Sequence, residues 1–246
     1  MHRLRTETSL LAREEADIGA EARRHLKVLR PKDGEKVELF DGNGKSREYR
    51  YVASTGALKA SGPVVERVRP DGRITLFACV TKGSRWDWTI EKATELGVGR
   101  IVPVISERTI VRLDKKERAA KRERWERVAE DAARQCGTPW LPEIVEPLDF
   151  ADAVELAKKT ACFAGILSDP PPRPMLAVFA EKAGEGGEYS VFIGPEGDFT
   201  PEEAAALSGF ATPVSLGELV LRAETAAICA VGLMTATLHA KKCFRK

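Results

Sequence analysis

Two short glycine-containing runs near the C-terminus have the residue types of a small-molecule pocket. Gly194 and Gly197 follow an apolar run at residues 189–193, and Gly217 precedes Arg222. Each run fits the end of a strand, a tight turn and the start of a helix, where bare backbone groups can approach a ligand closely. Two such runs in one third of the chain predict a single pocket built from loops at strand ends.

The same pattern has a plainer interpretation, because Pro and Gly are common in loops. Residues 194–197 alone fit a simple strand-to-helix turn, and the nearby residues 216–217 and Arg222 favour a binding site. Other glycine-containing segments do not fit phosphate loops. Val102 stands where a dinucleotide-binding fingerprint needs glycine, and Leu39 stands where a P-loop needs it. We therefore expect neither an NAD site nor a P-loop.

The first 70 residues have the pattern of short strands joined by turns. The predicted strands are residues 37–40, 49–52 and 64–68, with hairpin turn residues at 41–44 and a helix over 21–29. A small β-barrel over residues 1–70 is the expected closure. Residues 70–72 are the expected domain boundary, although they also fit an ordinary hairpin turn.

From residue 73 strands alternate with helices, which predicts an α/β domain with a mainly parallel sheet over residues 73–246. Thr200 and Glu203 have the spacing of a capping box, with Pro201 in the first turn of a helix. The predicted strands are residues 74–80, 101–105, 162–167, 189–193 and 214–216. The other predicted helices are residues 84–96, 114–136 and 224–241.

The formal net charge is only +2, but basic residues are unevenly distributed. Residues 23–50 hold nine Lys and Arg against five Asp and Glu, and residues 112–127 hold eight against four. Local surpluses of this kind can bind phosphates, although a solvated surface gives the same composition.

The five cysteines are far apart and form no C-x-x-C pair, so we expect no metal site. Thiols in apolar contexts indicate a reducing cytosol, and the first residues lack the apolar core of a signal peptide. The apolar stretch at 226–238 is expected to be too short to span a bilayer. We expect it to form a buried helix instead. We therefore expect a cytoplasmic protein with no membrane partner.

Several motifs occur together in a specific order. They are residues 25–30, 39–42, 82–85, 92–98 and 135–137 and the two C-terminal runs. With these motifs the chain resembles the ribosomal RNA small subunit methyltransferase E family, of the SPOUT class. The resemblance implies a trefoil-knotted sheet, an N-terminal PUA-like barrel that binds RNA, and a homodimer. It also implies methylation of N3 of a uridine in 16S rRNA of the small ribosomal subunit, with S-adenosylmethionine (SAM) as the cofactor.

The resemblance implies that Gly194, Glu196, Gly197, Leu216, Gly217 and Leu221 lie at the cofactor pocket, and the remaining candidates come from their position in the chain and from their chemistry. For cofactor binding we expect Leu167, Gly194, Pro195, Glu196, Gly197, Leu216, Gly217, Val220 and Leu221. For RNA binding we expect Lys82, Arg85 and Arg108, which follow predicted strands, and Arg3 and Arg30 in the barrel. Arg222, Glu224 and Glu196 are the expected catalytic residues.

The chemistry gives Arg222 a role. Removing the proton from uridine N3 leaves negative charge on the uracil oxygens, and a fixed guanidinium stabilises such charge or holds a phosphate. Alternatively, Arg222 pairs with Glu218 or Glu224 at a helix start. Glu196 and Glu224 are the carboxylates available as base or orienter, although either can instead bond backbone amides, which we expect for Glu196.

Two residues depart from the family pattern. Asp198 stands where relatives often have a second glycine, which adds a carboxylate and excludes a backbone angle open to glycine alone. Thr138 stands where relatives often have Arg. Two other functions stay open, namely methylation of another RNA site such as a ribose 2′-hydroxyl, and a non-catalytic RNA-binding assembly factor.

Overall fold

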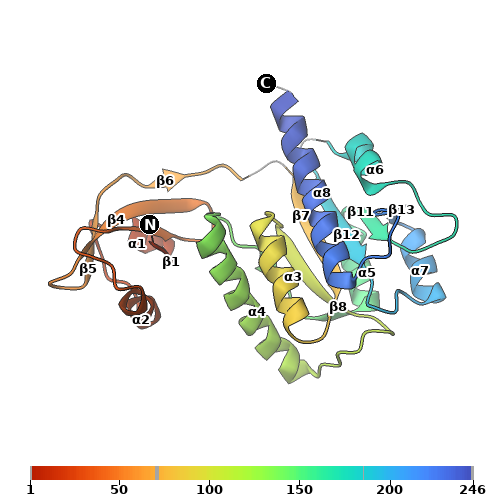
Figure 1. The fold of residues 1–246 in the computed structure, drawn as a ribbon, viewed down its shortest axis with the longest axis horizontal. Coiled ribbons are helices and arrows are strands. Elements are labelled where there is room, and N and C mark those ends of the chain that lie inside the picture. The colour runs from red at the N-terminus through yellow and green to blue at the C-terminus, as the bar shows by residue number, and fades with distance from the viewer. Residues whose placement is uncertain (1, 70–71, 185, 245–246) are drawn as a thin grey trace. The chain divides into compact units, whose positions relative to one another are not determined.

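The computed structural model describes residues 2–69, 72–184 and 186–244, so the expected boundary residues 70 and 71 lie outside it. Contacts between residues divide the chain into two compact units (Figure 1). Unit 1 comprises Met1–Arg69 and Glu130–Leu141. Unit 2 comprises Pro70–Ala129 and Pro142–Lys246.

Unit 1 is built on a mostly antiparallel sheet with the order β1-β3-β4-β5-β2, and β6 pairs with β4. Among the described residues no ladder joins β1 to β2, so the expected barrel is open between these strands. A cluster that includes Leu4, Val37 and Tyr49 forms the core. The strands are β1 His2–Arg5, β2 Glu15–Ala16, β3 Lys36–Phe40, β4 Lys45–Val52, β5 Ala57–Ala60 and β6 Val65–Glu66, and the helices are α1 Thr8–Leu11 and α2 Ala20–Leu29.

Residues 130–141 belong to unit 1 because they bond to its sheet. The Arg3 guanidinium donates to the carbonyl of Ala133 at 2.7 Å, and the amide of Gly44 donates to the carbonyl of Pro139 at 3.1 Å. Gly44 also lies so close to the Trp140 ring that a Cβ there would be 2.4 Å from it. The expected division into residues 1–70 and 73–246 instead assigns residues 130–141 to the second domain.

Unit 2 contains the predicted parallel sheet, with the order β10-β8-β7-β12-β11-β13 and β9 beside β8. Every recorded pairing in it is parallel. Its central strands are apolar on both faces, as a sheet covered by helices on both sides requires. The strands are β7 Arg73–Cys79, β8 Arg100–Ile105, β9 Glu143–Ile144, β10 Leu148–Asp149, β11 Ala161–Gly165, β12 Glu188–Ile193 and β13 Thr212–Val214.

Helices cover both faces of this sheet and create two cores. One core joins the sheet to α3, α6, α8 and the first part of α4, and α3 and α8 lie side by side on that face (Figure 1). The other core joins it to α5 and α7 through residues such as Val154 and Leu207. The helices are α3 Ser84–Glu95, α4 Lys115–Cys136, α5 Phe150–Ala157, α6 Met175–Lys182, α7 Pro201–Ser208 and α8 Ala223–Phe244.

Helix α8 is longer than the apolar stretch from which it was predicted. Its segment Ala223–Cys243 is long and apolar enough, by length and composition alone, to cross a membrane, so the expectation that it is too short was wrong. The helix nevertheless packs on the sheet, with Ala230, Val231 and Met234 fully buried. It is therefore a core helix, and the side that faces away from the sheet is more exposed and partly apolar.

Candidate functional site

The loops that carry the predicted site residues leave the sheet at the same edge. Ile193 of β12 is level with Ala78 of β7 and Gly165 of β11, and Gly165 is level with Val214 of β13. Because all these strands are parallel, their carboxyl ends meet at one edge, where ligands bind in open α/β sheets. The predicted residues in these loops or just beyond them are Lys82, Arg85, Arg108, Leu167, Gly194, Pro195, Glu196, Gly197, Leu216, Gly217, Val220, Leu221, Arg222 and Glu224.

The loop after β12 is a tight turn that needs glycine at its first position. The amide of Asp198 donates to the carbonyl of Pro195 at 3.0 Å and closes the turn. A Cβ on Gly194 would lie 2.9 Å from Asp198 Oδ1 and 3.3 Å from the Phe199 ring. Asp198 itself has a φ of 57°, a left-handed conformation that Asp tolerates through local hydrogen bonds. The departure from glycine is thus compatible with this turn.

Two arginines predicted to contact RNA bond this loop. Arg108 Nη1 donates to the carbonyl of Gly197 at 2.8 Å and to that of Phe199 at 3.3 Å. Arg85 Nη1 lies 3.3 Å from Glu196 Oε1. Glu196 therefore forms an ion pair, and no backbone amide of the described residues donates to it, contrary to the expectation. Both arginines hold the loop in place, and their contact with RNA stays a prediction.

The buried carboxylate of Glu203 also holds the loop after β12. The predicted capping box is confirmed, because the Thr200 hydroxyl accepts from the Glu203 amide at 3.2 Å and Glu203 Oε2 accepts from the Thr200 amide at 3.0 Å. Sequence reasoning missed the other oxygen, which accepts from the Glu107 amide at 2.9 Å. Glu203 thereby joins the loop after β8, which carries Arg108, to the loop after β12.

We expect Glu203→Ala to lower the free energy of unfolding by about 2–3 kcal/mol, because it leaves two backbone amides without acceptors and removes half of a capping box. Urea unfolding measures the change. The control is Glu202→Ala, an exposed carboxylate in the same helical turn. Equal losses in the two variants would contradict the role of Glu203.

The loop after β13 combines a special backbone conformation with apolar side chains. Ser215 Oγ donates to the carbonyl of Gly217 at 2.9 Å and accepts from its amide at 3.3 Å. Gly217 has a φ of 151°, which side-chain-bearing residues rarely adopt, yet a Cβ there would meet no described atom within 4 Å. Leu216 packs partly against the core, whereas Val220 is 77% exposed, as Leu167 is at 61%.

Arg222 and Glu224 follow this loop at the start of α8. Arg222 is exposed, and its guanidinium has no ion pair or hydrogen bond within the described parts of the chain, so the alternative pairing with Glu218 or Glu224 is absent. Glu224 is only 5% exposed, and its Oε2 has no partner among the described residues. Because unpartnered buried acceptors are costly, this oxygen is suited to receive a donor from a ligand.

The cysteine at this edge is no nucleophile. Burial raises the pKa of the Cys79 thiol to about 12, although hydrogen bonds with Ser106 and Thr109 act in the opposite direction. The thiol therefore stays neutral at physiological pH.

The two predicted RNA-binding residues of unit 1 differ in what they can reach. The Arg3 side chain is 8% exposed and bonds Glu38 at 2.5 Å and the carbonyls of Ala133 and Thr138. These bonds occupy all three of its nitrogens, so the prediction that Arg3 contacts RNA is corrected to a structural role inside unit 1. Arg30 ends α2 with a φ of 49° and is exposed.

Both units match known families. The sequence profile of an RNA methyltransferase domain matches residues 68–235, and that of an RNA methyltransferase PUA domain matches residues 18–59. The ribosomal RNA small subunit methyltransferase E of Synechocystis sp. is 31% identical over 216 residues, which cover 87% of this chain and 70% of that protein. The protein of the same name from Aquifex aeolicus is 32% identical, covering 69% of this chain and 71% of that protein.

A solved structure agrees with these relatives. The ribosomal RNA small subunit methyltransferase E from Neisseria gonorrhoeae, bound to S-adenosyl methionine, has a TM-score of 0.81 and 28% identity, covering 96% of this chain and 97% of that chain. The α/β sheet with its loops at one edge and the PUA domain thus define an RNA methyltransferase. The chain belongs to the ribosomal RNA small subunit methyltransferase E family.

Proposed function

We propose that the protein methylates N3 of a uridine in 16S rRNA, in the cytoplasm, with SAM as the methyl donor. Its family membership supports the rRNA methyltransferase activity and the cofactor. One observation supports the N3 chemistry: the guanidinium of Arg222, which has no ion pair or hydrogen bond among the described residues, is exposed beside the loops at the carboxyl edge of the sheet. A free cation at that place suits a reaction in which the uracil becomes an anion.

The residues at this edge fit the cofactor. Backbone groups of the loops after β12 and β13 can read an adenine, and the half-buried Leu216 and Leu221 can cover its ring. The Oε2 of Glu224, which has no partner in the described part of the chain, offers a buried acceptor for a donor of the ligand. When bound, SAM supplies an electrophilic methyl group.

Side chains at this edge would then bind the uridine and assist removal of its N3 proton. Arg222 stabilises the charge that forms on the uracil oxygens once N3 loses its proton. Glu196 is the more accessible of the two predicted carboxylates, with its side chain 30% exposed at the loop tip, so we assign it the proton transfer. Glu224, which is buried, would orient the ligand rather than accept the N3 proton. Lys82 is exposed just after β7 and would hold a phosphate.

We also infer the knot of the family from the chain path. β13 lies beyond β11 at the edge of the sheet, and α8 then returns to pack on β7 and β12. The loop after β11 is fastened to the same segment, because the amide of Ser215 donates to the carbonyl of Arg173 at 3.0 Å. A chain that passes back through such a loop would be knotted.

We expect the protein to be a homodimer in solution. Ile228 of α8 is partly exposed, and Leu219 in the loop before this helix is 81% exposed. Burying these side chains against a second copy would stabilise both. Light scattering at micromolar concentration should give twice the chain mass. A monomeric mass would contradict this prediction.

Mass mapping of modified nucleosides in 16S rRNA tests the function. RNA from a strain that lacks the gene should lose one N3-methyluridine, and the purified protein with SAM should restore it. Loss of a 2′-O-methyl group instead would identify another target. An unchanged methylation pattern, together with no SAM binding in calorimetry, would favour an assembly factor.

A further inference from the structure

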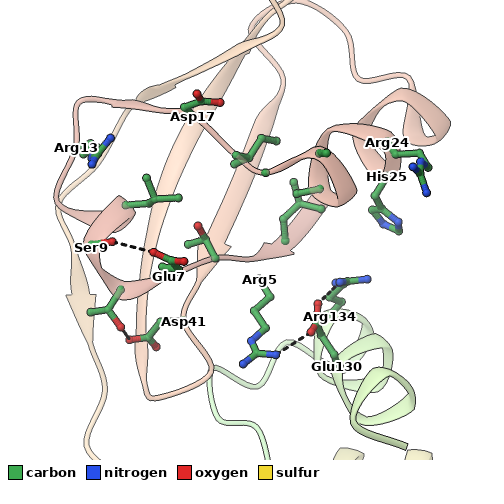
Figure 2. Close-up of a pocket in the computed structure, with 18 of the residues that line it drawn as sticks. Arg5, Glu7, Ser9, Arg13, Asp17, Arg24, His25, Asp41, Glu130 and Arg134 are labelled. Atoms are coloured by element: carbon green, nitrogen blue, oxygen red, sulfur yellow. Dashed lines mark hydrogen bonds and ion pairs between the residues drawn. The ribbon is translucent and has the colours of Figure 1, made fainter. Parts of the chain in front are cut away.

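A groove in unit 1 is balanced in charge. Its volume is about 1050 Å³, and it is lined by four arginines and four carboxylates (Figure 2). Figure 2 shows the ion pairs that Glu130 forms with Arg5 and Arg134. Because these charges are equal in number, the groove does not favour a ligand of either sign. A carboxylate without a cation partner lies instead in unit 2, in the loop after β12.

The side chain of Asp198 is fixed against the carboxyl end of β12. Its Oδ1 accepts a hydrogen bond from the Phe199 amide at 2.8 Å. The same oxygen would lie 2.9 Å from a Cβ on Gly194, so the carboxylate lies against the first residue of the loop. Asp198 is half-buried. Its charge is therefore held at the edge of the sheet where ligands bind in this class of fold.

This carboxylate keeps its charge without a cation partner. Within the described parts of the chain, Asp198 forms no ion pair with the cations of this edge, which are Lys82, Arg85, Arg108 and Arg222. The neighbouring carboxylate of Glu196 differs, because it pairs with Arg85 at 3.3 Å. Arg108 donates to the carbonyls on either side of Asp198 rather than to its carboxylate, so it offsets the negative charge only in part.

The turn itself does not require a charged side chain at this position. Asp198 has a φ of 57°, and Gly and Asn also adopt this left-handed conformation readily. An Asn side chain would accept the same bond from the Phe199 amide through its carbonyl oxygen. The geometry of the turn therefore explains the shape of Asp198 and leaves its charge without a structural reason.

The charge of the cofactor changes in the reaction. SAM carries a sulfonium, and loss of the methyl group leaves a neutral thioether in the product, S-adenosylhomocysteine. We propose that the Asp198 carboxylate selects the cationic cofactor over this neutral product, because it attracts the sulfonium and finds no charge in the thioether. This inference rests on the proposed function, which takes the loop after β12 as part of the cofactor site. It adds a residue that favours exchange of the product for fresh cofactor.

Calorimetry of the full-length protein with SAM, S-adenosylhomocysteine and sinefungin tests the proposal. Sinefungin carries an ammonium group in place of the sulfonium and therefore keeps the positive charge. We expect Asp198→Asn to reduce the preference for SAM over S-adenosylhomocysteine about fivefold, and the preference for sinefungin by a similar factor. The affinity for S-adenosylhomocysteine should change by less than about twofold. Asp198→Gly, which also removes the carboxylate and fits the turn, should behave in the same way.

Glu123→Gln is the matched control. It removes an exposed carboxylate of α4 that has no ion pair among the described residues, and it should leave all three affinities unchanged. An unchanged preference in Asp198→Asn would overturn the proposal. Equal losses of affinity for all three ligands would also overturn it, because they would assign Asp198 to a part that the ligands share or to the turn alone.

Binding of these ligands does not depend on the RNA target. If the wild-type protein prefers SAM as expected, the Asp198 variants lose that preference, and another RNA site is methylated, the proposed function fails and the role of Asp198 stands. If the protein methylates uridine N3 and the Asp198 variants keep the wild-type preference, the proposed function stands and this role fails.

Discussion

Replacing Arg222 by alanine should lower the rate of methyl transfer by about a hundredfold or more, the scale for the loss of one charge-stabilising donor. The affinity for SAM should stay nearly unchanged, because the guanidinium is exposed and bonds no part of the described loops. The physical reason is that no other group is assigned to balance the uracil anion, so the charge would form against water alone.

Single-turnover kinetics at saturating RNA, together with calorimetry of SAM binding, separate the two effects. Arg222→Lys keeps the charge but loses the planar fork of donors, so its rate should fall between those of wild type and Arg222→Ala. Lys159→Ala, which removes an exposed cation of unit 2 outside the site, should leave the rate unchanged. A loss confined to SAM affinity, with the rate constant preserved, would make Arg222 a cofactor-binding residue.

Gly217→Val should abolish measurable SAM binding, a loss of about a hundredfold or more, while the fold is retained. The φ of 151° is nearly closed to a β-branched residue, and strain of this kind costs about 1–3 kcal/mol. Since a Cβ at Gly217 would enter open space, the variant should release the strain by moving the loop after β13 and breaking both bonds with Ser215. The core below would stay intact.

Calorimetry with SAM measures this prediction, and Gly56→Val is its control. Gly56 has a φ of 70° and open space at its Cβ position, but it lies in unit 1 between β4 and β5. Its replacement should lower stability through comparable strain and leave SAM affinity unchanged. Unchanged affinity in folded Gly217→Val would show that the loop after β13 does not form the pocket.

Local signals in the sequence predicted the elements that carry the site. The capping box at Thr200 and Glu203 fixed the start of α7, and Gly97 ends the turn after α3 with a φ of 84°. The last strand ends at Val214 rather than residue 216, because Ser215 turns its hydroxyl back onto Gly217. Helices α5 and α6 were not predicted; each has only eight residues and lacks a capping hydrogen bond from a side chain.

The contacts that shape the site could not be predicted in this way. Arg108 reaches the carbonyl of Gly197 across 89 positions, and Glu203 reaches the Glu107 amide across 96. Arg3 was expected at an RNA surface, yet its partner Ala133 is 130 positions away. Arg3 and Arg108 are ordinary charged residues in their local sequence, and the local signal at Glu203 indicates only its capping box. Its role depends on which strands become neighbours, and spacing along the chain carries no information about that.

Because residues 130–141 belong to unit 1, the two units cannot be separated by a single cut in the chain. A gene fragment that encodes residues 1–70 alone would produce a sheet without the carbonyls that Arg3 binds and without the Trp140 ring that packs on Gly44. The complementary fragment would carry that segment with nothing to cover it. Neither fragment contains all of unit 1, so a gene recombined at this boundary would encode an incomplete domain. Transplanting unit 1 to another scaffold would require grafting two stretches at once, or a circularly permuted design that brings them together.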